Sequence, residues 1–346
     1  MANIKYSGPL SLRLRALATI SKIAIATSMR HAVGRKMAPD WDANFETGIR
    51  FIRHQFTTAM RGGDMVRGRL LFDAVQPETD DIYEVDTRDA EGINAIWYEP
   101  KTRKGDTVIL YLHGGGYGFH GGVSARYAQM IAHHTGLRLF APDYRLTPEH
   151  PHPAQADDAM AAWDYLAQSV PAKQVVVLGD SAGGHMTLML SIALREQKKE
   201  QPMLCVGLCP WTDIGDRGAS MTANDQYDLV QGWMAVMFGK WLDPKGTYGR
   251  KALSPISYNY EGLAPLYLQA GGREVLRDMV IDFEQVQKAH GADVMLDIWP
   301  DMPHNFQAYD SLKESSTQAL QRICKAIEMR AAGQGPLPPL KDITVT

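Results

Sequence analysis

Residues 174–184 read Gln-Val-Val-Val-Leu-Gly-Asp-Ser-Ala-Gly-Gly, a run that joins a strand to a helix through a tight turn. The β-branched valines predict a buried strand over 174–178, and the residues that follow predict a helix over 182–196. Ser181 stands at the apex, with Gly179 two positions before it and Gly183 two positions after it. Glycine lets the strand and the helix approach closely, so the serine hydroxyl is held at the helix N-terminus, where developing negative charge is stabilised. This context predicts that Ser181 is a nucleophile.

Short apolar strands alternate with helices on both sides of this turn. Strands are expected over 82–87, 93–98, 107–112, 137–141, 174–178, 204–208, 266–270 and 294–299. Helices are expected over 124–134, 156–168, 182–196, 279–290 and 312–329. Unbroken apolar strands that alternate with helices indicate a mainly parallel sheet covered on both faces. The fold class is therefore α/β, with eight strands.

Three segments fall outside this alternation. Residues 1–75 predict two amphipathic helices, because apolar residues recur every three or four positions from Leu10 to Ile23 and from Trp41 to Met60. We expect their apolar faces to pack on the protein rather than on a membrane surface. Residues 211–255 interrupt the core as an insertion rich in aromatic residues and methionine, and residues 333–346 form a proline-rich surface tail. The core is expected over 76–210 and 256–332.

Composition limits the class of protein. The chain of 346 residues carries a net charge of −3, without the basic surplus that nucleic-acid binding needs. No apolar run approaches the ~18 residues of a membrane span, and charged residues interrupt the N-terminal stretch as they would a signal peptide. The three cysteines form neither a disulfide framework nor a metal-binding motif. We therefore expect a cytoplasmic protein with no metal site and no nucleic-acid partner.

A second motif, His113-Gly114-Gly115-Gly116, follows the strand expected over 107–112. Backbone N–H groups free of side chains can stabilise the oxyanion of an acyl-transfer reaction. Gly115 and Gly116 are predicted to donate such hydrogen bonds, together with Ala182. His113 is expected to brace this loop.

The same loop carries an alternative interpretation. Residues 116–121 read Gly-Tyr-Gly-Phe-His-Gly, which matches the pattern of a dinucleotide-binding turn, and an acidic residue, Asp143, lies about 20 residues on. However, the first glycine comes several residues after the strand ends, whereas a dinucleotide turn normally starts there. Dinucleotide binding is therefore the weaker alternative, and no cofactor is expected.

His304 and a carboxylate complete the chain order nucleophile, acid, histidine. His304 follows the strand over 294–299, so it lies at the carboxyl edge of the sheet, within reach of Ser181. The loop after the strand over 266–270 offers Glu274 and Asp278 as the acid that orients the imidazole. Glu274 comes sooner after the strand and is preferred, whereas Asp278 also suits a charge at the start of a helix.

Together these motifs resemble those of the hormone-sensitive-lipase family of carboxylesterases. The resemblance covers roughly residues 80–330 and rests on 113–116, the turn at 179–184, Asp-Tyr-Arg-Leu-Thr-Pro-Glu-His-Pro at 143–151, Pro-Trp-Thr-Asp at 210–213 and His304. It implies an α/β-hydrolase fold with a helical cap made from the N-terminal residues and the insertion over 211–255. It also implies a cofactor-free serine esterase that acts on small to medium carboxylic esters.

The resemblance carries further expectations and two departures. Tyr117, Asp180 and Trp211 are expected to bind the substrate, and two copies of the chain are expected to dimerise through the last strand. The family usually has Asp-Pro-Leu where this chain has Glu274-Val275-Leu276, and glycine where it has Asn305. An amidase or arylacylamidase would use the same residues and remains the alternative function.

Overall fold

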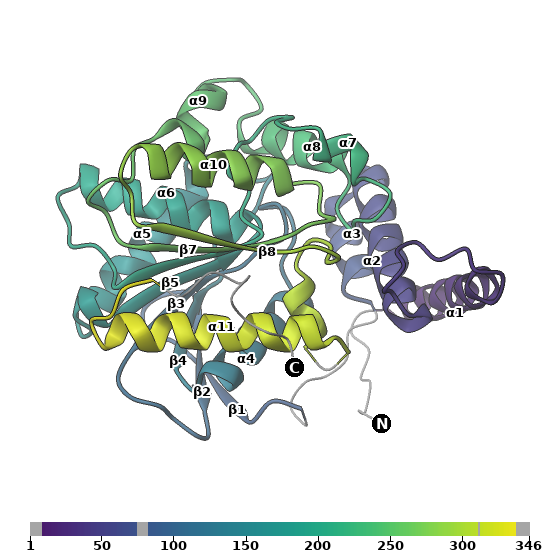
Figure 1. Cartoon of the computed structure of the whole chain (residues 1–346), viewed down its shortest axis with the longest axis horizontal. Helices are drawn as coiled ribbons and strands as arrows, with labels where there is room; N and C mark the ends of the chain where they lie inside the picture. The colour runs from purple at the N-terminus through teal and green to yellow at the C-terminus, as the bar shows by residue number, and fades with distance from the viewer. Residues whose placement is uncertain (1–8, 75–81, 311, 337–346) are drawn as a thin grey trace.

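The computed structural model describes residues 9–74, 82–310 and 312–336 and contains an eight-stranded sheet between two layers of helices (Figure 1). The strands are β1 (Val85–Asp89), β2 (Ala95–Pro100), β3 (Val108–Leu112), β4 (Arg138–Pro142), β5 (Val175–Asp180), β6 (Leu204–Leu208), β7 (Leu266–Gly271) and β8 (Val294–Trp299). They lie in the order β1-β2-β4-β3-β5-β6-β7-β8, in which β2 is antiparallel to both neighbours and the other pairs are parallel. The expected α/β fold with eight mainly parallel strands is confirmed.

Helices cover both faces of this sheet, as Figure 1 shows. One face carries α4 (Gly122–Thr135) and α11 (Glu314–Ala331), and the other carries α5 (Ala154–Ala167), α6 (Ala182–Glu196) and α10 (Arg277–Ala289). Every residue of the central strand β5 is buried, and its side chains alternate between the two faces. Val175 and Val177 join one apolar cluster, whereas Val176 and Leu178 join the other. Short 3₁₀ turns complete the core as η1 (Ala172–Gln174), η2 (Pro255–Ser257) and η3 (Phe306–Tyr309).

The remaining helices come from the N-terminal segment and the insertion. They are α1 (Leu10–Ala32), α2 (Ala43–Arg61), α3 (Met65–Phe72), α7 (Ser220–Ala223), α8 (Gly232–Leu242) and α9 (Gly249–Leu253). Figure 1 shows α2 and α3 beside α7 and α8, beyond one end of the sheet, with α1 outermost. Arg53 of α2 joins the two segments, because its guanidinium lies 2.8 Å from the Asp225 carboxylate and donates to the Asp228 carbonyl oxygen at 2.8 Å. None of the helices in the described ranges combines the length and the apolar character that crossing a bilayer requires.

Several boundaries differ from those expected. The first strand begins at Val85 rather than 82, since Tyr83 turns inward to donate a hydrogen bond to the Asp310 carboxylate at 3.0 Å. A separate helix, α3, follows α2 because the Asp64 side chain caps it, accepting from the Arg67 N–H at 3.0 Å. The insertion forms three helices, of which α8 contains the aromatic and methionine residues at helical spacing. The expected boundary after residue 75 and the tail over 337–346 lie outside the described residues.

Candidate active site

Ser181 occupies the turn between β5 and α6 in a strained conformation. Its φ is 54° and its ψ is −116°, a combination that costs a non-glycine residue about 1–3 kcal/mol. The Ser181 N–H donates to the Leu208 carbonyl oxygen at 2.8 Å and anchors the turn to β6. A Cβ atom at Gly183 would lie 1.8 Å from the Leu112 carbonyl oxygen, so only glycine fits there. The sequence of this turn is therefore dictated by the close approach of α6 to β3.

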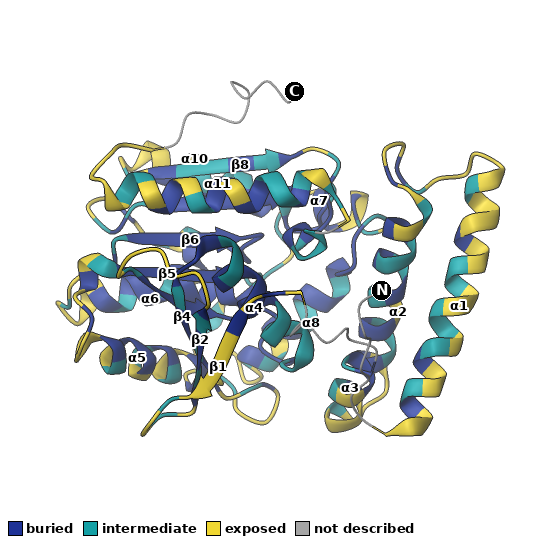
Figure 2. Ribbon diagram, turned by 90° about the horizontal axis from the view of Figure 1, so that it is seen from below, coloured by how far each residue is buried: buried dark blue, intermediate teal, exposed yellow. Residues whose placement is uncertain are grey.

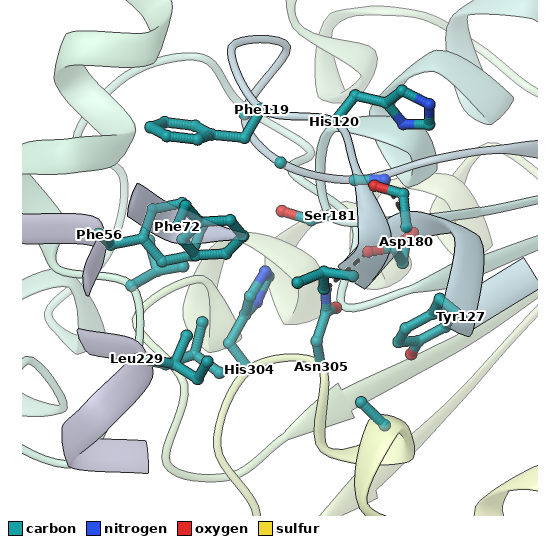
Figure 3. Close-up of a pocket in the computed structure, with 18 of the residues that line it drawn as sticks. Phe56, Phe72, Phe119, His120, Tyr127, Asp180, Ser181, Leu229, His304 and Asn305 are labelled. Atoms are coloured by element: carbon teal, nitrogen blue, oxygen red, sulfur yellow. Dashed lines mark hydrogen bonds between the residues drawn. The ribbon is translucent and has the colours of Figure 1, made fainter. Parts of the chain in front are cut away.

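His304 and Glu274 reach the same edge of the sheet from the loops after β8 and β7. The Nδ1 atom of His304 lies 3.0 Å from Oε2 of Glu274, and both side chains are buried. The Nε2 atom of His304 is buried and has no hydrogen-bond partner among the described residues. His304 and Ser181 line one cavity, as Figure 3 shows. Burial lowers the pKa of His304, but the hydrogen bond and charge of Glu274 outweigh burial, so the pKa is raised above its usual 6.5.

Asp278, the other acid that the sequence offered, lies at the start of α10. Its carboxylate accepts a hydrogen bond from the Ser220 N–H at 2.8 Å and pairs with Arg277 at 2.8 Å. The backbone hydrogen bond and the charge of Arg277 outweigh the effect of burial and lower the pKa of Asp278. The structure therefore brings Glu274, and not Asp278, to His304.

The glycine loop after β3 faces the cavity beside Ser181. Gly115 and Gly116 line the cavity with positive φ values of 100° and 61°. The N–H groups of Gly115 and Gly116 donate to no backbone oxygen among the described residues. Ala182 is the first residue of α6, so its N–H lacks an acceptor within the helix. This arrangement leaves three backbone donors for an oxyanion. The Tyr144 hydroxyl donates to the His113 carbonyl oxygen at 2.6 Å and braces the loop.

Asp180 connects the loops of the site rather than offering a free charge to a substrate. Its Oδ1 atom accepts from the Tyr111 hydroxyl at 2.6 Å and from the Gly114 N–H at 2.8 Å. Its Oδ2 atom accepts from Nδ2 of Asn305 at 2.6 Å. Asn305 has a φ of 52° and a ψ of 35°, so it adopts the left-handed conformation that glycine adopts easily. Asparagine tolerates this conformation better than most residues, and its side chain donates a hydrogen bond to Asp180.

Tyr117 and Trp211, both expected to bind the substrate, line two different cavities. The side chain of Tyr117 lines a neighbouring cavity and not the one around Ser181. Its buried hydroxyl needs a polar partner and lies 2.5 Å from Nδ1 of His185. Trp211 lines the cavity around Ser181.

Asp228 is a buried carboxylate of the site that no sequence pattern identifies. It lies in the insertion between α7 and α8, and it accepts N–H groups of Leu229 at 2.7 Å, Val275 at 2.7 Å and His304 at 3.1 Å. It therefore holds the loop of Glu274 and the loop of His304 together. Burial raises the pKa of Asp228 to about 6. It belongs to no recognisable motif, because an isolated aspartate in an insertion looks like a solvated surface residue.

One cluster among the described residues has the spacing of a metal site. Ligand atoms of Cys209, Glu274 and His304 all lie within 4.8 Å of one another. Burial and the charge of Glu274 raise the pKa of the Cys209 thiol, so it stays protonated, whereas metals bind the thiolate. Glu274 and His304 are bonded to each other. These residues therefore do not fit a metal ion.

The dinucleotide alternative is not favoured by the loop at 116–121. A Cβ atom at Gly121 would lie 2.1 Å from Oδ2 of Asp73, and the same oxygen accepts from the Gly122 N–H at 2.8 Å. A carboxylate thus occupies the start of α4, where a pyrophosphate would have to bind. The negative charge of Asp73 would also repel it.

The cavity around Ser181 measures about 350 Å³ and is mostly apolar. Figure 3 shows Phe56, Phe72, Phe119 and Leu229 around it, with Ser181 and His304 exposed to its interior. Its walls come from the N-terminal helices, the insertion and the sheet edge, so no single segment of the sequence builds it. The arrangement suits an apolar group bound beside an activated serine.

Comparison with known proteins agrees with this geometry. Residues 109–308 match the family described as alpha/beta hydrolase fold. The chain is 32% identical over 250 residues to an acetyl-hydrolase of Streptomyces hygroscopicus, covering 70% of this chain and 81% of that protein. It is 29% identical over 225 residues to an esterase of Acinetobacter venetianus, covering 63% and 73%. A solved esterase from the bacterial hormone-sensitive lipase family has a TM-score of 0.69 at 27% identity and covers 94% of this chain and 100% of that one.

Proposed function

The chain belongs to the family of the α/β-hydrolase fold and is a carboxylic ester hydrolase of the hormone-sensitive-lipase type, and we propose that Ser181, His304 and Glu274 carry out its reaction. One observation above all supports this assignment. His304 shares an apolar cavity with Ser181, its Nδ1 lies 3.0 Å from the buried Glu274, and its Nε2 is left without a partner among the described residues.

The proposed reaction follows from these roles. His304 takes the proton of the Ser181 hydroxyl as the serine oxygen attacks the ester carbonyl carbon. The N–H groups of Gly115, Gly116 and Ala182 stabilise the oxyanion. Glu274 stabilises the imidazolium, which then protonates the departing alcohol and leaves an acyl-enzyme. His304 next activates a water molecule, whose attack releases the carboxylic acid and restores Ser181.

We propose that the substrates are small to medium esters with an apolar acyl or alcohol group. The volume of the cavity and its aromatic lining support this class, because such a wall binds apolar groups and offers few hydrogen bonds. Two of the reported proteins are named esterases and one is named an acetyl-hydrolase, so the amidase alternative is not favoured.

A p-nitrophenyl alkylphosphonate should bond covalently to Ser181 and inactivate the protein. The serine oxygen attacks phosphorus and releases p-nitrophenolate, which gives an adduct that resembles the tetrahedral intermediate. Intact-mass measurement and peptide mapping should place the adduct on Ser181. Ser124, a second serine that lines the cavity, provides the control, and Ser124→Ala should label as the wild type does. An adduct on Ser124 in the inactivated wild type would overturn the assignment.

The pH profile should report the proton on His304. Only the neutral imidazole can accept the serine proton, and the pKa of His304 is raised above 6.5, so kcat/KM should fall as the pH falls through a value above 6.5. Hydrolysis of p-nitrophenyl acetate, followed by stopped-flow absorbance, measures the profile. An apparent pKa clearly below 6.5 would contradict an imidazole held by a charged Glu274.

Three further features complete the proposal. Residues 1–75 and 211–255 form a cap over the site, which the contacts of Arg53 with Asp225 and Asp228 support. A second copy pairs at the free edge of β8, which bonds to β7 alone among the described strands. The chain is cytoplasmic, which its free cysteines support, because thiols persist in a reducing compartment.

A further inference from the structure

Helix α1 has two opposite apolar faces, of which only one is covered. Leu12, Ala16 and Thr27 are buried against the neighbouring helices of the N-terminal segment. Apolar side chains on the other side remain in solvent, and their exposed fractions are Leu10 61%, Leu14 57%, Ile25 63% and Met29 67%. On a helix of 3.6 residues per turn, these four side chains lie within an arc of about 100°, on one face of α1. We call them the outer stripe of α1, and Figure 2 shows this helix at the edge of the molecule.

Positive charge lies beside the outer stripe. The chain has no aspartate or glutamate before Asp40, whereas α1 carries the exposed residues Arg15, Lys22 and Arg30. None of these three cations pairs with a carboxylate in the described part of the chain. Since the whole chain has a net charge of −3, the rest of the chain is acidic, and the positive charge of α1 is separate from it in the sequence.

A basic groove lies on another side of α1, where this helix meets α2. It has a volume of about 790 Å³ and lies between α1, α2 and the loop before α8. Its lining includes the basic side chains Arg30, Lys36, Arg50, Arg53, His54 and Arg61. Glu46 and Asp225 pair with Arg50 and Arg53. Arg61 instead lies over the ring of Trp233, 5.2 Å from its centroid. The groove thus keeps an excess of positive charge, which adds to the charge of the cations on α1.

We propose that the outer stripe of α1, together with the exposed cations of this helix, docks on an anionic lipid surface. The apolar side chains enter the interface between headgroups and acyl chains, and the cations bind the lipid phosphates. A soluble anion would satisfy the groove but would leave the outer stripe in water. A second copy that covered the outer stripe by its own α1 would bring two sets of Arg15, Lys22 and Arg30 together, and like charges repel. A lipid surface satisfies the outer stripe and the cations of α1 at once.

Docking in this way would bring lipid close to the catalytic cavity. Ile20 of α1 lines that cavity together with Phe51 and Ile52 of α2. The helix that would lie on the lipid therefore also forms a wall of the site. Hydrolysis of esters held in the lipid would rest on the proposed function. Lipid binding by α1 does not rest on it.

Vesicle co-sedimentation of the full chain tests the proposal. We expect binding to vesicles of phosphatidylglycerol and phosphatidylcholine in equal parts, little binding to phosphatidylcholine alone, and weaker binding as salt is raised. The double variant Arg15→Glu/Lys22→Glu should weaken partitioning by more than about tenfold. Lys101→Glu/Lys173→Glu changes the net charge equally at exposed positions at the opposite end of the sheet, and should bind within about threefold of wild type.

A second pair of variants tests the outer stripe without changing charge. Leu14→Gln/Ile25→Gln/Met29→Gln should weaken vesicle binding by about tenfold or more. Tyr248→Gln removes an exposed aromatic side chain at the N-cap of α9, a helix far from α1 in Figure 1, and should bind as wild type does. All four variants should hydrolyse a water-soluble ester normally, since none of the changed residues lines the catalytic cavity. This readout separates lost docking from lost catalysis.

Several outcomes would overturn the proposal, and the first two need no variant. In the first, the wild-type protein does not bind anionic vesicles. In the second, it binds both vesicle types equally. If the α1 charge variant and the control charge variant lose vesicle binding equally, then the net charge of the protein alone determines its binding. Inorganic phosphate binding without vesicle binding would identify a soluble anion as the occupant. A change of molar mass in the glutamine variant, with vesicle binding unchanged, would show that a second copy covers the outer stripe.

Discussion

Ser181→Ala should lower kcat/KM for p-nitrophenyl butyrate by about 10⁴-fold or more. Removal of the hydroxyl removes the atom that forms the acyl-enzyme, and no other group in the cavity can replace it at that position. The residual rate should come from water attacking an ester that the backbone N–H groups still polarise. Alanine also lacks the hydroxyl but keeps the Cβ atom, so the turn between β5 and α6 should persist.

The control for this variant is Ser124→Ala, which removes a hydroxyl from the wall of the same cavity. It should keep kcat/KM within about threefold of wild type, since surface and wall substitutions away from the reacting atoms have small effects. Circular dichroism and Tm should match wild type for both variants. If folded Ser181→Ala hydrolyses the ester at a rate close to wild type, then Ser181 is not the nucleophile.

The part of the site that the sequence could predict is the part whose geometry is local. Gly179, Ser181 and Gly183 lie within five positions of the chain, so the geometry of one tight turn determines all three residue types. A Cβ atom at Gly183, for example, would overlap the Leu112 carbonyl oxygen. The strands were predictable for a similar reason, because a strand covered on both faces must be apolar throughout. Burial of the whole of β5 meets that condition.

The rest depends on contacts between distant segments, which no local pattern records. Asp228 joins the loops of Glu274 and His304 from a different part of the chain. The Tyr117 side chain lines a neighbouring cavity, which the sequence could not show, because a motif gives the position of a residue but not the direction of its side chain. The spacing of α1 showed that apolar residues recur, but only packing shows which face is covered.

Glu274→Gln should lower kcat by about 10³- to 10⁴-fold, whereas Asp278→Asn should change it by less than about fivefold. Glutamine keeps the size of the side chain but loses the charge that stabilises the imidazolium. Its amide NH₂ can also face Nδ1 of His304 and favour the wrong tautomer. Asp278 lies at the start of α10 and bonds to Ser220 and Arg277, so its loss should reduce Tm slightly and leave the chemistry intact.

A merely structural role for Glu274 would not move the pKa that the pH profile reports. Since the hydrogen bond and charge of Glu274 raise the pKa of His304, the acidic limb of the kcat/KM profile should shift to lower pH in Glu274→Gln. Asp278→Asn should leave this limb where it is. Asp228→Asn, made in the Glu274→Gln background, tests the second buried carboxylate near His304. If Glu274→Gln keeps activity within about tenfold and the added Asp228→Asn abolishes it, the charge that His304 requires comes from Asp228.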